Sequence, residues 1–374
     1  LKELKELENK NKQALLENDN NTLYPHLNDK YFNKKIFKKR EFNETKMEKQ
    51  PNIKDIKAIT NRLCQDQEFE LAPHQMFVRN FLSFQTPYNG LLLFHGVGTG
   101  KTCSAISVSE EMREYNKQMN ITKEILIVAS PNVQTNFKLQ LFNEKKLKEV
   151  NGLWNIKSCT GNKFLKEINP MNMKGLPKTD VIKQINRIIK QNYKFLGYTE
   201  FSNYISKIID KYSTKGKKNE KKALRNEFSN RLIIIDEVHN LRITDKVKDV
   251  KKSTENLKKV VVYANNLKLL LLSATPMYDN AREIIWILNI LNLNDNRFPI
   301  EENEIFDSNN NILTEDGKGK ELLVQKATGY ISYVRGENVF TFPYRIYPND
   351  MGEKGSLEYM MKNKWEYPSK QAND

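Results

Sequence analysis

A glycine-rich run, HGVGTGKT at residues 95–102, has the residue types needed to hold a chain of phosphates. Its three glycines allow positive φ angles and a close approach of the backbone to phosphate oxygens. Successive N–H groups at the start of a helix then form an anion site. Lys101 would place its charge on the β- and γ-phosphates, and Thr102 would offer a hydroxyl to Mg²⁺. The residues expected to contact the nucleotide here are Gly96, Gly98, Thr99, Gly100, Lys101, Thr102 and Cys103.

Two features of this run bear on its specificity. His95 stands where the general pattern has glycine, whereas the remainder, Gly-x-Gly-Lys-Thr after an apolar strand, is intact. A glycine-rich loop that contains Lys-Thr by chance is the alternative. The strand–turn–helix context favours the phosphate site.

An acidic pair ends a second apolar run, in RLIIIDEVHN. In an open parallel sheet, functional groups gather at the carboxyl ends of strands. Asp236 could hold Mg²⁺, directly or through water, and Glu237 could act as general base on the attacking water. Carboxylates at a helix N-terminus are the alternative explanation. The order of the motifs favours catalysis, so Lys101, Asp236 and Glu237 are the predicted catalytic residues.

Polar residues in two further segments could serve the same site. In SATP, Ser273 and Thr275 could hydrogen-bond His239 and report the state of the γ-phosphate. An ordinary turn is the alternative, because Ser, Thr and Pro are common in turns. In LAPHQ, Gln75 could read the edge of an adenine, or it could face solvent.

Apolar runs that alternate with helical segments predict the elements that position these motifs. Continuous apolar runs suit strands that are buried on both faces, and alternation with helices implies βαβ units with a parallel sheet. The fold class is therefore α/β. The predicted strands are Leu91–Phe94, Ile125–Ala129, Ile156–Cys159, Leu232–Ile235 and Leu269–Leu272. The third is interrupted by Lys157 and Ser158 and is assigned from its position.

The chain divides into three expected parts. Residues 1–65 form a charged helical extension with an irregular basic stretch, FNKKIFKKREFNETK. Residues 66–293 form the nucleotide-binding domain, with a basic helical insertion at 162–230. Residues 294–374 form a linker and a partial connecting segment, in which a short helix and one or two strands are expected.

The composition permits a nucleic-acid partner without establishing one. Lys and Arg total 61 against 46 Asp and Glu, a net charge of +15 that attracts polyanions. An AT-rich genome that yields many solvated lysines is an equally good explanation. The three cysteines, at 64, 103 and 159, form no Cys-x-x-Cys pair, so we expect no disulfide framework, no structural zinc and a reducing intracellular compartment. No apolar run approaches the ~20 residues of a membrane span, and the charged start lacks a signal-peptide pattern.

The ordered series HGVGTGKT, ASPNVQTNF, TGN, DEVHN and SATP resembles the first lobe of superfamily 2 (DEAD/DEAH-like) helicases. Within it, the chain is similar to helicases and early transcription factor ATPases of large nucleocytoplasmic DNA viruses, also in EFNETK, FLGYTEFSNYI and YVRGENVFTFPYRIYP. The resemblance implies a RecA-like P-loop domain, use of ATP and Mg²⁺, coupling of hydrolysis to movement through Ser273 and Thr275, and a location in the virion or the infected host cytoplasm. It also implies contacts to nucleic acid near Ser130, Pro131, Asn132, Thr160 and Gly161. DNA is the preferred partner, and the sequence leaves RNA open as the alternative.

Helicases of this superfamily hold ATP between two RecA-like lobes. Arginines of the second lobe are worth ~10³–10⁵ in rate in related systems. No Gln-x-x-Gly-Arg-x-x-Arg pattern follows residue 276, and Arg335 and Arg345 are isolated, so we assign neither as an arginine finger. The ~100 residues after SATP are too few for a second lobe. With Leu1 in place of methionine, this predicts a processed chain or a fragment, with a second lobe in the full-length protein and weak or no turnover alone.

Two functions remain open at this point. The first is part of an ATPase motor that moves on or remodels nucleic acid. The second is a viral transcription subunit that binds nucleic acid, RNA polymerase or a second transcription factor subunit and uses ATP as a conformational switch. In the second, residues 34–40 and the loop around Lys215–Lys222 would be docking surfaces, although solvated charge is the favoured explanation of each.

Overall fold

The computed structural model describes residues 23–46, 70–213, 217–241, 248–277, 280–308, 310–313 and 318–334. All of them belong to one compact unit, which comprises Leu1–Gln50 and Asp66–Gly336. Cys64, Lys215, Arg335 and Arg345 lie outside the described residues. Within the described part, no helix has both the length and the apolar character needed to cross a membrane.

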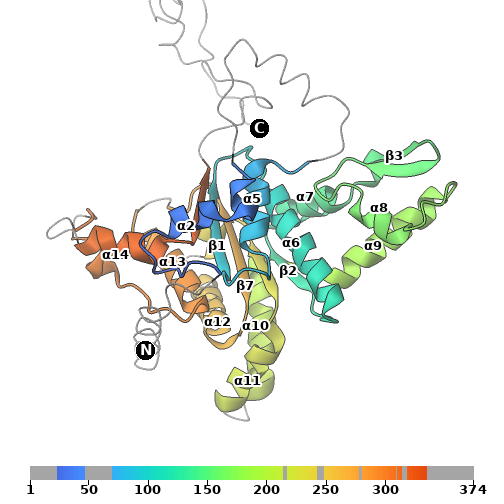
Figure 1. Cartoon of the computed structure of the whole chain (residues 1–374). Coiled ribbons are helices and arrows are strands. Elements are labelled where there is room, and N and C mark those ends of the chain that lie inside the picture. Colours follow the sequence, from blue (N-terminus) through green and yellow to red (C-terminus); the bar gives the residue numbers. More distant parts are fainter. Residues whose placement is uncertain are drawn as a thin grey trace, which may run out of the picture. The chain divides into compact units, whose positions relative to one another are not determined.

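A sheet of six parallel strands, in the order β5-β2-β6-β7-β1-β8, forms the centre of this unit (Figure 1). The strands are β1 Gly90–His95, β2 Ile125–Val128, β5 Tyr193–Leu196, β6 Leu232–Ile235, β7 Lys268–Ser273 and β8 Ile331–Val334. Every residue of β2, β6 and β7 is buried, as expected for aliphatic strands with helices on both faces. The α/β class is confirmed, and four of the predicted strands are β1, β2, β6 and β7.

The helices pack in two groups on this sheet. One group consists of α5, α6 and α7, and the other of α10, α11, α12 and α13. The helices are α2 Phe32–Lys38, α3 Arg40–Asn43, α5 Pro73–Phe81, α6 Lys101–Gln118, α7 Pro131–Leu141, α8 Lys163–Ile168, α9 Lys178–Asn192, α10 Tyr198–Ser213, α11 Lys217–Phe228, α12 Lys248–Tyr263, α13 Glu283–Asn294 and α14 Lys318–Ala327. Short 3₁₀ turns occur at Glu144–Lys146, Val238–Leu241 and Glu302–Glu304.

The predicted strand Ile156–Cys159 is wrong. A strand, β4 Leu153–Ile156, ends at Ile156 and pairs antiparallel with β3 Leu147–Val150 in a separate hairpin. The main sheet instead gains β5, which pairs with β2 on the side away from β6 and lies inside the segment 162–230, where only helices were expected. β5 reads YKFL and is an edge strand with one buried residue, so it lacks the continuous apolar run that marks the central strands.

The basic stretch that begins at Phe32 is helical over α2 and α3, so the prediction of irregular structure there is wrong. Phe32 and Phe42 are buried in the main core, where their rings contact Phe81 of α5. A Cβ on Gly329 would lie 2.4 Å from Leu27, so this segment also packs closely against the turn before β8. Residues before 66 therefore help to complete the core.

The chain after residue 293 also joins the domain. The helix α14 and the strand β8 agree with the short helix and strand expected there, and β8 pairs with β1. The sheet therefore extends past the boundary at 293.

Candidate functional site

The loops after β1, β6 and β7 meet at one edge of the sheet. Phe94 pairs with Ser273, and Ile235 pairs with Leu271, so the three strands end at nearly the same level. Since β7 lies between β1 and β6, those two strands are about 10 Å apart, which is two interstrand spacings. The phosphate loop and the acidic pair are therefore neighbours, and the charge of Lys101 acts on the pKa of Asp236.

The phosphate loop folds around its own lysine. Lys101 Nζ donates hydrogen bonds to the carbonyl oxygens of His95 (3.0 Å) and Gly96 (3.3 Å). Thr99 Oγ1 donates to the same Gly96 oxygen at 2.8 Å. Gly100 has a φ of 81° and is the residue that precedes α6, which begins at Lys101. This left-handed turn points the chain into the helix as the glycine pattern predicts.

The start of α5 supports the loop from the side. Gln75 is 7% exposed; its Oε1 accepts a hydrogen bond from the Ala72 amide (3.0 Å), and its Nε2 donates to the Gly100 oxygen (3.2 Å). The solvent-facing alternative for Gln75 is thus excluded. His74 Nε2 lies 2.9 Å from the Thr99 oxygen, a contact that sequence reasoning missed. The only signal for it was its place beside Gln75.

His95, which departs from the general pattern, is fully buried at the end of β1. Its Nε2 lies 2.9 Å from Ser332 Oγ of β8. Burial above all, and then the neighbouring His74 and Lys101, lower the pKa of His95 to about 4. A neutral side chain that packs beside β8 does not obstruct the phosphate loop, so the departure from glycine is compatible with the site.

The acidic pair follows β6 directly. Asp236 is 8% exposed, and its Oδ1 accepts a hydrogen bond from the Glu237 amide at 2.9 Å. Burial, and next the charge of Glu237, raise the pKa of Asp236 to about 6, while that amide and Lys101 act in the opposite direction. Tyr198 donates from its hydroxyl to the Asp236 carbonyl oxygen at 2.8 Å, and Asn240 Nδ2 donates to the Tyr198 hydroxyl at 3.3 Å. Tyr198 lies in FLGYTEFSNYI, and no motif in the sequence predicted its contact with the acidic pair.

The residues predicted to couple hydrolysis to movement form a continuous chain of contacts. Glu237 Oε2 lies 3.4 Å from His239 Nδ1, which in turn lies 3.1 Å from Ser273 Oγ. Ser273 Oγ also accepts a hydrogen bond from the Thr275 backbone amide at 3.1 Å. Thr275 thus joins through its backbone, and its side chain is exposed.

The predicted nucleic-acid residues lie at opposite ends of α7. Ser130 is the residue before the helix, and Pro131 and Asn132 are exposed in its first turn. Thr160 is buried, and its hydroxyl donates to the Leu141 oxygen at the other end of α7 (2.9 Å). An eleven-residue helix is about 16 Å long, so the two groups are linked by α7 rather than adjacent. The side chain of Thr160 does not reach the surface.

Beside Thr160, Gly161 has a φ of 52° and open space around its Cα.

A disulfide joins Cys103 and Cys159, with Cα atoms 5.2 Å apart. The expectation that these cysteines form no disulfide is wrong, and the inference of a reducing compartment loses that premise. The two residues are 56 positions apart and meet only through the fold, so spacing gave no signal. The sulfur of Cys103 is therefore bonded to Cys159, and Cys103 can offer only its backbone amide to a nucleotide.

The donor set suits ATP and Mg²⁺. Within the described part of the chain, no group of three or more His, Cys, Asp or Glu forms a metal site by itself. Magnesium is commonly held by one or two carboxylates together with substrate phosphates, which matches Asp236 and Thr102 beside the phosphate loop. Glu237 Oε2 is buried and has no hydrogen-bond partner among the described residues. A buried carboxylate oxygen in that state fits a water molecule at the γ-phosphate.

Comparisons with known proteins agree with this arrangement. A sequence profile of the SNF2-related domain matches residues 15–326. A candidate ATP-dependent RNA helicase of Acanthamoeba polyphaga mimivirus is 29% identical over 355 residues, which cover 89% of this chain and 28% of the relative. A candidate helicase of Invertebrate iridescent virus 3 is 29% identical over 285 residues (73% and 24%). The early transcription factor large subunit homolog of African swine fever virus is 23% identical over 323 residues (74% and 28%). The chain spans about a quarter of the length of these relatives.

Proposed function

This chain belongs to the SNF2-related domain family of superfamily 2 helicases, and from that membership we propose that it binds ATP with Mg²⁺ and hydrolyses the β–γ bond in response to nucleic acid. The observation that carries the proposal is the meeting of the phosphate loop and the acidic pair at one edge of the sheet. The hydrolysis would drive movement on nucleic acid, or its remodelling, inside the infected cell or virion.

Each polar group has a distinct role in this proposal. Lys101 would leave the carbonyls of His95 and Gly96 and bind the β- and γ-phosphates. Thr102 and Asp236 would hold Mg²⁺, which supplies positive charge against the charge that develops on the transferred phosphoryl group. Glu237 would orient the attacking water and accept its proton.

The contact chain from Glu237 through His239 to Ser273 would carry the state of the γ-phosphate to β7. His239 is within reach of both Glu237 and Ser273, so a change at the carboxylate alters the hydrogen bonding of the imidazole. Nucleic acid would contact Ser130, Pro131, Asn132 and Gly161, with Thr160 fixing the loop at the end of α7. DNA is the proposed partner because the chain resembles helicases of large nucleocytoplasmic DNA viruses.

A second RecA-like lobe in the full-length protein would close the site over ATP. Its arginines would neutralise transition-state charge and contribute ~10³–10⁵ in rate. The described residues bring no arginine to the acidic pair in any contact found there. We therefore expect slow hydrolysis by this chain alone.

A second candidate is a transcription subunit that binds nucleic acid or RNA polymerase and uses ATP as a conformational switch without unwinding. The match to an early transcription factor subunit homolog favours it. The two candidates share the ATP site and differ in the consequence of hydrolysis. Displacement of an annealed strand or of a protein bound to the nucleic acid, measured with the full-length protein, distinguishes them, because only a motor displaces either one.

The test is steady-state ATP hydrolysis with and without single-stranded DNA or RNA. We expect nucleic acid to raise the hydrolysis rate of the wild type. In Lys101→Ala we expect that rate to fall at least ~10²-fold, because the lysine would contact the transferred phosphoryl group. Lys190→Ala is the matched control, since Lys190 is an exposed lysine at the end of α9. Undiminished hydrolysis in Lys101→Ala would overturn the assignment of the site.

A further inference from the structure

The disulfide joins two functional segments of the fold. Cys103 is the third residue of α6, directly after Lys101 and Thr102. Cys159 lies between β4 and α8 and directly precedes Thr160. Their Cα separation of 5.2 Å is within the range that a disulfide spans without moving the backbone. A covalent bond therefore connects the phosphate-binding turn to the loop proposed to meet nucleic acid.

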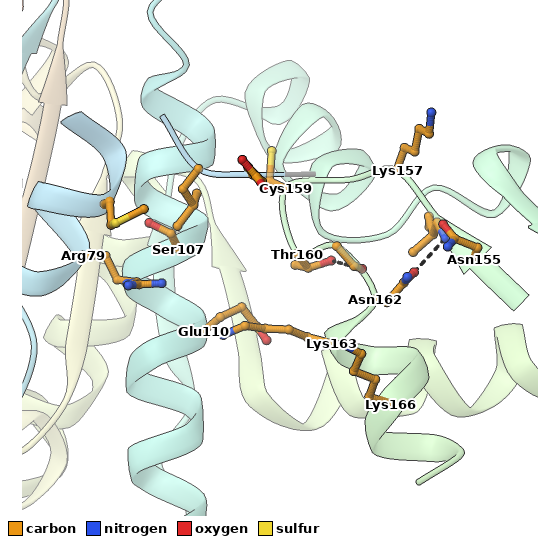
Figure 2. Close-up of a pocket in the computed structure, with 15 residues that line it drawn as sticks. Arg79, Ser107, Glu110, Asn155, Lys157, Cys159, Thr160, Asn162, Lys163 and Lys166 are labelled. Carbon is orange, nitrogen blue, oxygen red and sulfur yellow. Dashed lines mark hydrogen bonds between the residues drawn. The ribbon is translucent and has the colours of Figure 1, made fainter. Parts of the chain in front are cut away.

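Cys159 also lines a cavity of about 560 Å³ between α5, α6 and residues 155–166 (Figure 2). Figure 2 shows Cys159 and Thr160 on the loop, with Ser107 and Glu110 on the helix α6. A cavity of this size admits a drug-sized or tripeptide-sized molecule. The disulfide is thus reachable by a small dissolved thiol.

The charged residues that line the cavity favour binding of an anionic small molecule. Its basic lining residues are Arg79, Lys157, Lys163 and Lys166, of which Lys163 pairs with Glu114 of α6 at 2.8 Å. The acidic ones are Glu70 and Glu110, and Glu110 is neutralised by Arg113, which donates to both of its carboxylate oxygens at 2.8–3.1 Å. The excess of positive charge attracts anions and stabilises thiolates.

We propose that Cys103–Cys159 is a reversible redox crosslink, that a low-molecular-weight acidic thiol exchanges with it through this cavity, and that the crosslink sets how strongly nucleic acid stimulates ATP hydrolysis. The first two parts stand on the geometry, and the third rests on the proposed function.

Complete reduction of the Cys103–Cys159 disulfide consumes two thiol molecules. A thiolate RS⁻ attacks one cysteine sulfur, the S–S bond breaks, and the other cysteine leaves as a thiolate that takes up a proton. A second thiolate attacks the resulting mixed disulfide, which releases RSSR and the second cysteine thiol. Two electrons pass from the two RSH molecules to the protein. Oxidation by RSSR is the reverse.

The effect of reducing the disulfide depends on the other contacts between α6 and α8. Glu167 of α8 accepts hydrogen bonds from Arg113 (2.7 Å) and Lys117 (2.8 Å), both farther along α6. These ion pairs hold the two helices together away from the phosphate loop, and the disulfide is an additional tie at the first turn of α6. Reduction removes only this tie. The loop at Thr160 is then held by the hydrogen bond from Thr160 to Leu141 and by the ion pair of Lys163 with Glu114, and its distance from Lys101 is no longer fixed by a covalent bond. The oxidised form holds the loop at a fixed distance from Lys101.

The experiment compares this chain in reduced and oxidised glutathione, a tripeptide thiol of net negative charge. Alkylation and peptide mass mapping report the crosslink, hydrogen–deuterium exchange reports residues 157–168, and ATP hydrolysis is measured with and without single-stranded DNA. We expect a Cys103–Cys159 peptide only in the oxidised sample, slower exchange of 157–168 there, and stimulation by DNA at least ~5-fold greater after reduction.

Three variants sharpen the test. Cys159→Ser has the stimulation of the reduced form in both buffers, whereas Cys64→Ser keeps the redox response. Lys166→Glu slows reduction by glutathione but leaves reduction by an uncharged dithiol unchanged, because only the anionic thiol depends on the basic lining.

The outcomes separate the inference from the proposed function. Free Cys103 and Cys159 thiols in oxidised glutathione, or a mapped crosslink with equal DNA stimulation in both states, would overturn the inference and leave the ATPase standing. The same measurement on the full-length protein tests the ATPase: a mapped crosslink with no hydrolysis in either state there would overturn the ATPase and with it the third part of the proposal.

Discussion

Glu237 has an unusual backbone conformation for its place after a buried strand. Its φ is 44°, in the left-handed region that residues with a Cβ rarely adopt. Such outliers cost about 1–3 kcal/mol and persist where the surrounding structure requires them. Here the conformation accompanies the contact of Glu237 Oε2 with His239 and leaves that oxygen without a hydrogen bond in the described part of the chain. This combination is what we would expect of a general base.

Glu237→Gln tests this role. Glutamine has the same shape but cannot accept the proton of the attacking water, so we expect turnover to fall by ~10²–10⁴. Nucleotide affinity, measured with a fluorescent ATP analogue, should change little. A variant that retains more than a tenth of the wild-type turnover would exclude Glu237 as the base.

His95 makes the stability of the domain depend on pH. Its pKa is about 4 in the folded protein, against 6.5 for the free side chain. Below pH 6.5 the imidazole of His95 is protonated in the unfolded chain but stays neutral in the folded chain. The contribution of neutral His95 to the free energy of unfolding is therefore fully present above pH 6.5 and is lost as the pH falls toward 4. The linked loss from this one residue is at most about 3 kcal/mol.

The measurement is urea unfolding at several pH values for the wild type and His95→Gln. Glutamine does not titrate, and it can still hydrogen-bond Ser332. We expect the difference in unfolding free energy between the two proteins to change by about 2–3 kcal/mol between pH 7 and 4. Parallel pH profiles would show that His95 is not held neutral.

At the scale of elements, a buried ion-pair network joins α6, α8 and β5. Arg113 is 4% exposed and pairs with Glu110 and Glu167. The Tyr193 hydroxyl of the edge strand β5 donates to the same Glu110. This network holds α6, which follows the proposed phosphate loop, against α8 and β5.

Arg113→Met leaves Glu110 buried without its partner, for which the usual cost is about 3–5 kcal/mol. Adding Glu110→Met should restore most of the lost stability, because no buried charge is then left alone. Lys117→Met removes the exposed partner of Glu167 and should cost less than about 1 kcal/mol. Chemical denaturation measures all three. Equal costs for Arg113→Met and Lys117→Met would contradict the burial argument.

The central strands could be predicted from sequence because burial on both faces demands continuous aliphatic residues. LIII of β6 and KLLLLS of β7 are fully buried and were recognised in this way. β5 could not be recognised, because an edge strand tolerates Lys194 and needs no apolar run. The false strand at Ile156–Cys159 has the reverse cause: its apolar start belongs to a hairpin, whose pairing depends on β3.

Some contacts in the candidate site could be predicted from the sequence, and others could not. Motif order predicted that Lys101 and Asp236 would be neighbours, because parallel strands end at one edge. Contacts that depend on tertiary packing could not be predicted: Tyr198 on Asp236, Ser332 on His95, and the pairing of Cys103 with a cysteine 56 residues away.

For the whole molecule, the net charge of +15 predicts binding to nucleic acid that weakens with salt. If about four phosphates of a single strand are neutralised, affinity should fall about 50-fold between 50 and 200 mM salt. Fluorescence anisotropy with labelled single-stranded DNA measures this.

A pair of matched variants locates the path of the strand. Lys138→Gln, on the exposed face of α7, should reduce the salt slope by about 0.7, which is the loss of one phosphate contact. Lys222→Gln, on α11, should leave it unchanged. The opposite pattern would move the nucleic acid to the helices α10 and α11.

The central claim is that the loops after β1 and β6 hold the same nucleotide and its magnesium ion. Calorimetric titration of a slowly hydrolysed ATP analogue, with Mg²⁺ or with a chelator, tests it in wild type, Lys101→Met, Asp236→Asn and the double variant. We expect at least ~10-fold tighter binding with Mg²⁺ in the wild type, no Mg²⁺ dependence in Asp236→Asn, and a coupling energy above about 1 kcal/mol between the two substitutions. Equal affinities in all four proteins, or strictly additive losses with the Mg²⁺ dependence intact, would contradict the claim.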